Sequence, residues 1–281
     1  MVGRLSLPLA HRVGSLLGTL LMIFPSTLKS TARRNISLCF NNLNENQREA
    51  LLRAHFIEFG KSICEVPVIW KSSPEQLTAV VKDVTGLSEF TRALEQGKGV
   101  VIAAPHLGAW EFVGYYLSLR APMTILYRPP HMSALDEPLR YGRERFGVRL
   151  VPTDKRGVRA LLDALHRGEM IGILPDQDPG RDNGVFAPFF GVTANTMTLL
   201  TRLVMRTEAT VFITFAERLP KAQGYRIHFK QVDCTEQGGV EQGVAALNHA
   251  LEDAIRIAPE QYLWTYKRFK TRPAGERSFY E

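Results

Sequence analysis

The stretch from Gly99 to Phe112, GVVIAAPHLGAWEF, constrains the fold more than any other part of this 281-residue chain. Uncharged β-branched residues follow Gly99, and Pro105 ends the run, which is typical of a strand buried on both faces. Residues 110–119 then have the pattern of a helix. A buried strand that passes directly into a helix predicts an α/β fold, in which the strand ends open onto a crevice where ligands bind.

His106 and Glu111 lie at this strand end, five residues apart. A carboxylate one helical turn beyond the imidazole can hold one ring N–H, fix the tautomer and leave the other nitrogen free as a base. Two neighbours favour a site here, because Gly108 leaves the backbone accessible and Trp110 supplies an apolar wall. No serine or cysteine close by offers a nucleophile, so we expect the imidazole to take a proton from a substrate hydroxyl. A His/Glu pair with no catalytic role is the alternative.

The segment PHLGAWE resembles the H-x4-[DE] signature of the glycerolipid acyltransferase superfamily, and its HxGxWE form resembles the bacterial lipid A late acyltransferases, the lauroyl and myristoyl transferases. Four further blocks extend the resemblance over nearly the whole chain: RRN with a following CF, YRP, DQD-x-G with a downstream FFG, and QYLWTYKRFKTRP. In the last block Tyr266 stands where this family usually has a histidine. The resemblance implies a glycerol-3-phosphate acyltransferase-like fold, a single α/β domain with a central mixed β-sheet flanked by helices.

The resemblance also implies a reaction and its partners. A late step of lipid A synthesis would move a fatty acyl chain from an acyl carrier protein thioester to a hydroxyl of a lipid A precursor, with His106 and Glu111 as the catalytic pair. It implies no cofactor, no nucleic-acid partner, and a location on the cytoplasmic face of the inner membrane. Three alternatives stay open: another acceptor such as a phosphatidylinositol mannoside, lysophospholipid or aminolipid; thioester hydrolysis; and a basic membrane or nucleic-acid-binding protein without catalysis.

Polar residues after two other apolar runs are candidates for substrate binding, together with Gly108 and Trp110. Arg128 follows the run 123–127, and its guanidinium offers paired donors for a phosphate or carbonyl in the crevice of His106; a surface arginine is the alternative. Asp176, Gln177 and Asp178 follow the run 170–174. We expect them to bind hydroxyls of the acceptor or to orient catalytic groups. A magnesium site is the less favoured alternative, and we expect no bound metal.

The first 30 residues predict a membrane-associated hydrophobic helix, and residues 31–281 the acyltransferase domain. Sixteen uncharged residues between Arg12 and Lys29 would form a helix of about 24 Å, short of the ~30 Å hydrocarbon core. The helix spans a bilayer only if Arg12 snorkels, and otherwise lies on its surface. A signal peptide would have a similar length, but positive charge directly after the apolar run favours a cytoplasmic location for the remainder.

The net charge of +7 indicates anionic partners: anionic phospholipid, a phosphorylated substrate, an acidic carrier protein or nucleic acid. Three cysteines far apart predict small buried side chains in a reducing compartment. Near the C-terminus a cationic, partly aromatic strip is expected, which by itself could equally bind RNA. Its members are Tyr266, Lys267, Arg268, Phe269, Lys270 and Arg272.

Sequence patterns also predict individual elements. We expect a helix over 49–70 capped by Asn44 or Asn46, a strand over 77–84, a helix ending at Gly97, and a helix over 197–206 capped by Asn195 or Thr196. Further along, 225–232 has the alternation of an antiparallel edge strand and 240–257 that of an amphipathic helix. Glycines between 180 and 191 predict a flexible loop, which with Phe186, Phe189 and Phe190 forms either a lid over an acyl chain or an ordinary packed loop.

Overall fold

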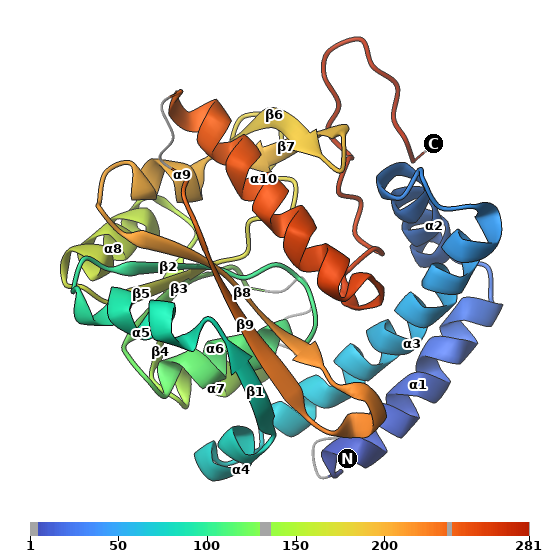
Figure 1. Cartoon of the computed structure of the whole chain (residues 1–281), viewed down its shortest axis with the longest axis horizontal. Helices are drawn as coiled ribbons and strands as arrows, with labels where there is room; N and C mark the ends of the chain where they lie inside the picture. The colour runs from blue at the N-terminus through green and yellow to red at the C-terminus, as the bar shows by residue number, and fades with distance from the viewer. Residues whose placement is uncertain (1–4, 130–135, 235–237, 281) are drawn as a thin grey trace.

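A seven-stranded mixed sheet forms the centre of the computed structural model, which describes residues 5–129, 136–234 and 238–280 (Figure 1). The strand order is β1-β9-β8-β2-β5-β3-β4. All neighbouring strands are parallel except β8 and β9, which are antiparallel. The predicted single α/β domain with a mixed central sheet is therefore confirmed. The strands are β1 (Val81–Thr85), β2 (Val100–Ala103), β3 (Met123–Tyr127), β4 (Val148–Pro152), β5 (Met170–Ile173), β8 (Thr210–Arg218) and β9 (Tyr225–Val232).

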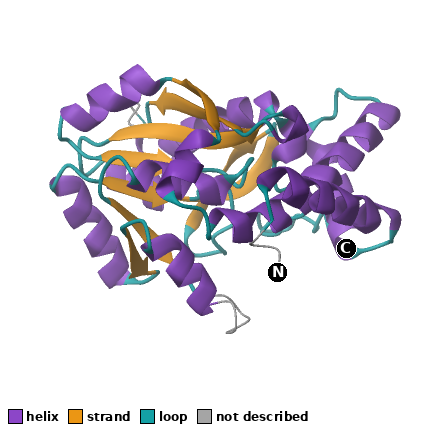
Figure 2. Ribbon diagram, turned by 90° about the horizontal axis from the view of Figure 1, so that it is seen from below, coloured by secondary structure: helices purple, strands orange, loops and turns teal. Residues whose placement is uncertain are grey.

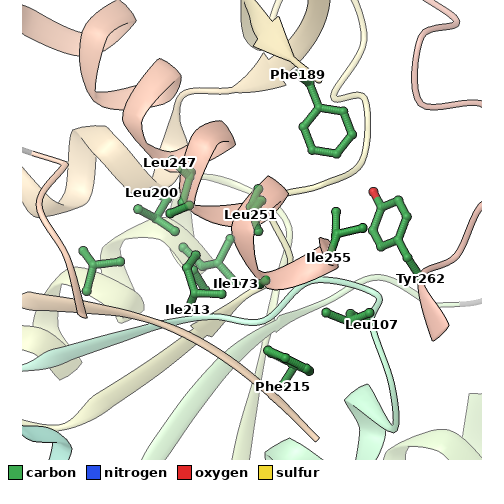
Figure 3. Packing of buried hydrophobic residues seen from close by; sticks show 14 of the residues in the cluster. Leu107, Ile173, Phe189, Leu200, Ile213, Phe215, Leu247, Leu251, Ile255 and Tyr262 are labelled. Carbon is green, nitrogen blue, oxygen red and sulfur yellow. The ribbon is translucent and has the colours of Figure 1, made fainter. Parts of the chain in front are cut away.

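Helices cover both faces of this sheet, as Figure 2 shows. On one face α10 packs its apolar side, including Leu251 and Ile255, over Ile173 and Ile213 of the strands (Figure 3). The other face carries a second apolar core that includes residues of α5 and α6. The middle strands β2 and β5 are buried throughout, so the chain can only reach solvent where they end. The helices are α5 (Leu87–Glu95), α6 (Trp110–Ser118), α7 (Asp136–Glu144), α8 (Lys155–His166), α9 (Leu199–Val204) and α10 (Gly239–Ile257).

Three N-terminal helices, α1 (Leu7–Ile23), α2 (Thr27–Cys39) and α3 (Glu45–Ile69), lie beside the sheet, with α1 along α3 (Figure 1). The two backbones touch at glycines: a Cβ on Gly18 would lie 2.0 Å from the carbonyl oxygen of Phe56, and one on Gly60 would lie 2.0 Å from that of Gly14. Among the described residues no single helix is long and apolar enough to cross a membrane. In this part of the chain one pair of helices, α1 and α2 with a bend of 87° between them, reaches the required length and apolarity together.

Most predicted elements are present, and some are not. Asn44 caps α3 in a capping box, the helix α10 lies where it was expected, and the three cysteines are buried and free. The strand predicted over 77–84 is wrong in its first half, because Ser73 and Gln76 form a capping box that begins the short helix α4 (Pro74–Ala79). The strand β9 is not an edge strand, since β1 pairs with its outer side.

The predicted flexible loop over 180–191 is also wrong. It forms an antiparallel hairpin of β6 (Gly184–Phe189) and β7 (Val192–Met197), and Phe189 and Phe190 are buried in the core beneath α10. Asn195 and Thr196 belong to β7, and the helix α9 begins only after Thr198. The hairpin is therefore part of the packed domain rather than a lid.

Candidate active site

His106 and Asp176 meet at the carboxyl edge of the sheet because two parallel strands end there in register. Ala103 of β2 is paired with Ile173 of β5, and each of the two polar residues lies three positions further along its chain. The Nδ1 atom of His106 lies 2.8 Å from Oδ1 of Asp176, and the backbone N–H of His106 donates to Oδ2 at 2.9 Å. The imidazole is 15 % exposed and the carboxylate 2 %, so one end of the pair faces solvent.

The hydrogen bonds around His106 indicate its tautomer. A carboxylate accepts only, so the proton on the ring lies at Nδ1 and is donated to Asp176. The other nitrogen, Nε2, lies 3.2 Å from the amide nitrogen of Gln177, which donates to it. The Nε2 atom is therefore the basic one, and a polar side chain already occupies its lone pair.

Asp176 stays ionised although it is buried. Burial by itself raises the pKa of the Asp176 carboxyl, but the electrostatic interaction with His106 and the two hydrogen bonds from that residue, with a smaller effect of Arg268, hold this pKa below its ordinary value. A fixed negative charge next to Nδ1 stabilises the imidazolium that forms when Nε2 takes up a proton.

The structure corrects the expected partner of the imidazole, because Glu111 binds elsewhere. Its carboxylate forms a two-point ion pair with Arg143 of α7, in which Nε lies 3.1 Å from Oε2. Burial lowers the pKa of the Arg143 guanidinium, but the charge and hydrogen bonds of Glu111 outweigh this effect and raise the pKa. Asp176, which the sequence placed among the substrate-binding candidates, holds His106 instead.

The expected accessibility of the Gly108 backbone is wrong as well. The N–H of Gly108 donates to the carbonyl oxygen of Gln261 at 3.1 Å, and its own carbonyl accepts from Nη2 of Arg218 at 2.8 Å. Gly108 has a φ of 61°, and a Cβ there would lie 2.0 Å from the carbonyl oxygen of Ala216. Only glycine fits this position, and it fixes the turn that carries His106.

Arg218 connects this turn to the N-terminal helix through buried charges, a network that the sequence did not suggest. Its guanidinium lies 2.6 Å from Glu65 of α3, and the same carboxylate lies 3.0 Å from Nε2 of His11 in α1 and accepts from the Tyr225 hydroxyl. Burial raises the pKa of Glu65, but Arg218 and His11 outweigh it and lower this pKa. Helix α1 is thus bonded, through two intermediates, to a residue two positions beyond His106.

Comparison with known proteins identifies the family to which these residues belong. A family model described as bacterial lipid A biosynthesis acyltransferase matches residues 1–271. The chain belongs to this family. A lipid A biosynthesis palmitoleoyltransferase of Escherichia coli is 32% identical over 281 residues, covering 99% of this chain and 90% of the relative. A lauroyltransferase of the same organism is 28% identical over 282 residues, covering 100% and 91%.

A lipid A biosynthesis acyltransferase of Haemophilus influenzae is 32% identical over 245 residues, 86% of this chain and 77% of the relative. The predicted resemblance is therefore confirmed, and the protein is an acyltransferase. In a member of this family, the strand-end pair of His106 and Asp176 is the natural place to look for the transfer chemistry.

The other two residues of the DQD segment, Gln177 and Asp178, make different contacts. Asp178 is 6 % exposed, and its carboxylate accepts from Gly180, Asn195 and Thr271, so it fastens the segment to the C-terminal tail. The expected binding of substrate by Asp178 has no support in this geometry. Gln177, by contrast, is half-buried and touches the basic nitrogen of His106.

The cationic strip near the C-terminus is only half as accessible as expected. Arg268 and Arg272 are buried and bind the carbonyl oxygens of Asn195 and Thr193 in the hairpin. Their charges are therefore structural, and Lys267 and Lys270 alone remain exposed. The hydroxyl of Tyr266 accepts from the backbone N–H of Asp178 at 3.1 Å. Tyr266, which stands where the family usually has a histidine, therefore has a structural role.

An apolar cavity of about 80 Å³ lies beside the site, between α6, α7 and strands β2 to β5. Trp110 lines it, and its ring centroid is 5.6 Å from that of His106. The Glu111–Arg143 pair also lines the cavity, and Gly114 leaves room in its wall, since a Cβ there would meet open space. Arg128 is exposed at the end of β3, the strand next to β5, so it lies at the same sheet edge. Within the described residues, no group of three potential ligands gathers as a metal site would require.

Proposed function

We propose that this acyltransferase moves a fatty acyl chain from an acyl carrier protein thioester to a hydroxyl of a lipid A precursor, as a late step of lipid A synthesis. The acceptor class follows from what the relatives are named for. The observation that carries the proposal is the pairing of His106 with Asp176, which leaves Nε2 as a base near solvent.

In this proposal the acceptor hydroxyl replaces Gln177 as the partner of Nε2. As His106 takes the hydroxyl proton, the oxygen attacks the thioester carbonyl carbon and a C–O bond forms. The tetrahedral intermediate then expels the thiolate by breaking the C–S bond, and the imidazolium returns its proton to sulfur. A positioned base supplies about 10²- to 10⁴-fold of rate, and Asp176 supports it by stabilising the imidazolium.

The part of the donor's acyl chain nearest the thioester would lie in the apolar cavity next to Trp110, because its volume of about 80 Å³ holds only a few methylene groups. Its walls come from buried strands and from α6, which also begins next to the catalytic turn. A chain threaded there keeps its carbonyl beside His106. Arg143, held by Glu111 at the cavity, is then a candidate to bind the thioester carbonyl or the donor phosphate, and the exposed Arg128 is a second one.

The catalytic role expected for Glu111 stays a prediction. The carboxylate is half-buried and paired with Arg143, so its removal would leave a guanidinium without its partner beside the cavity. We infer that Glu111 acts through Arg143, whereas Asp176 acts through His106. The two carboxylates can be separated by experiment, because their loss affects different groups.

We also propose that the protein acts at the cytoplasmic face of the inner membrane. The outer side of α1 has large exposed apolar residues at helical spacing, and the inner side is occupied by the contact with α3. This one-sided distribution favours a helix that lies in the membrane–water interface. The sequence before Glu45 contains no acidic residue that would repel anionic lipid. The exposed residues are Leu9, Val13, Leu16, Leu20 and Ile23.

The test is an assay of the purified protein with a defined carrier-protein thioester and a lipid A precursor. We expect acylated precursor from the native protein and none from a folded His106→Ala variant. Free fatty acid in equal amounts with and without acceptor would instead indicate a thioesterase. Activity only with a lysophospholipid, aminolipid or phosphatidylinositol mannoside would overturn the acceptor and keep the chemistry.

A further inference from the structure

A groove of about 530 Å³ lies between α2 and the C-terminal tail, and none of its lining residues takes part in the site described above. Two cationic side chains, Arg34 of α2 and Lys267 of the tail, line it from these two segments. Hydroxyl side chains line the remainder, among them Thr27, Ser30 and Ser278. Cations together with hydroxyl donors are the usual partners of a phosphate group.

Aromatic rings of the tail hold both cations in place. The Nε atom of Arg34 donates to the carbonyl oxygen of Phe279 at 3.2 Å, and its guanidinium lies 5.4 Å from that ring. The ammonium of Lys267 lies 5.7 Å from the ring of Tyr280. Among the described residues these contacts use only Nε of Arg34, and neither terminal nitrogen donates a hydrogen bond. Less side-chain freedom is then lost when a ligand binds.

The charge of the groove is not neutralised within the described part of the chain. No carboxylate of a described residue pairs with Arg34 or Lys267, and none of the described residues that line the groove is acidic. The neighbouring Arg33 points elsewhere and forms an ion pair with Glu49 at 3.1 Å. Two cations with several hydroxyls match a dianionic terminal phosphate better than a single carboxylate.

The groove begins where an apolar surface ends. Ile23, Phe24 and Leu28 are exposed at or next to the bend between α1 and α2, and Thr27 of the groove is the first residue of α2 after this bend. Exposed apolar residues beside a cationic groove are typical of a lipid site at the membrane–water interface. The apolar residues enter the acyl-chain region, and the cationic groove binds the headgroup.

We propose that this groove binds the terminal phosphate of a lipid headgroup, with Arg34 and Lys267 as the two cations. The inference rests on the membrane attachment proposed above, and it adds a headgroup site that is separate from the catalytic pair. It makes binding selective for the kind of anionic lipid rather than for surface charge alone.

The test compares two double variants with the same change in net charge. Arg34→Gln with Lys267→Gln removes both groove cations, and Arg33→Gln with Lys270→Gln removes two cations outside the groove. Both are checked for native circular dichroism and thermal midpoint. Binding is measured by flotation with phosphatidylcholine vesicles that contain either phosphatidic acid, with a terminal phosphate, or phosphatidylglycerol at equal surface charge.

We expect the native protein and the control to prefer phosphatidic acid, and the groove variant to bind it about 30-fold more weakly, since each lost cation costs about five- to sixfold. Equal losses in both double variants, or no preference for phosphatidic acid, would overturn the proposal. Saturable binding of inorganic phosphate that matches the lipid in affinity would show a free-phosphate site instead. Flotation needs no turnover, so this result is independent of whether acyl transfer is found.

Discussion

Asp176 binds His106 at two points, with Oδ1 2.8 Å from the ring nitrogen Nδ1 and Oδ2 2.9 Å from the backbone nitrogen. The backbone contact fixes the turn and the ring contact fixes the tautomer, so one buried carboxylate determines both where the base lies and which nitrogen is basic. This relationship makes Asp176 the residue whose loss is most informative.

Replacing Asp176 by asparagine preserves the shape of the side chain and removes its charge. We expect kcat to fall by about 10²- to 10⁴-fold, because the amide neither stabilises the imidazolium nor fixes the tautomer. The KM for both substrates should change little. Steady-state kinetics with the carrier-protein thioester measure the split.

Glu111→Gln is the matched variant for the other carboxylate. If Glu111 acts through Arg143, this variant raises KM for the donor more than it lowers kcat in steady-state kinetics with the carrier-protein thioester. A loss of kcat in Glu111→Gln as large as in Asp176→Asn would restore the His–Glu pair as the catalytic unit.

Gly114 lines the apolar cavity, and a Cβ at this position meets open space. Gly114→Leu should fill the cavity without harm to helix α6, since leucine favours helix more than glycine does. We expect the ratio of kcat/KM for long over short acyl donors to fall by about tenfold or more. Gly114→Ala serves as the control with a small effect, and a uniform loss for all chain lengths would place the acyl chain elsewhere.

Gly108 and Gly97 both have positive φ, 61° and 67°, but only Gly108 is crowded. Alanine at Gly97 should cost about 1–2 kcal/mol from the backbone conformation alone. Alanine at Gly108 should cost about 1–3 kcal/mol more, because its Cβ would overlap the carbonyl of Ala216. Urea denaturation measures both, and equal costs would contradict the crowded turn.

His55 makes the stability of the protein depend on pH. Burial lowers its pKa from 6.5 to about 4, with weaker opposing effects from the backbone of Glu260 and Tyr262. The unfolded chain therefore binds a proton more readily between these values, so stability is complete above pH 6.5 and declines as the pH falls towards 4. The loss amounts to about 3 kcal/mol.

His55→Leu should remove that part of the decline, measured as the difference in unfolding free energy between pH 7.5 and pH 4.5 relative to the native protein. The control is His249→Leu, because the His249 side chain is 77 % exposed. A native decline that persists unchanged in His55→Leu would show that other groups cause it.

The sequence predicted the sheet strands and most helices because each has a local cause, such as the buried run before Pro105 or the cap at Asn44. It failed where pairing partners decide the structure. The glycine-containing segment over 180–191 forms a hairpin since β6 and β7 pair with each other, and β9 is interior since β1, distant in sequence, joins it.

The site was predicted in its residues but not in its contacts. His106 and Asp176 were both named, yet their meeting depends on the parallel register of Ala103 with Ile173. A signal existed, because each residue follows a buried run and comes directly after a proline. Arg143 and Arg218 gave no such signal, since a charged residue in a helix or strand is usually exposed.

The buried path from His11 through Glu65 and Arg218 to Gly108 also affects how the protein can be shortened. A shortened protein that begins at α2 would expose the surface of α3 around Gly60, against which α1 packs. It would also remove the hydrogen bond between His11 and the buried carboxylate of Glu65. Such a truncation would loosen the turn beneath the base. The packing of α1 against α3 and the alignment of the imidazole thus belong to a single folded unit.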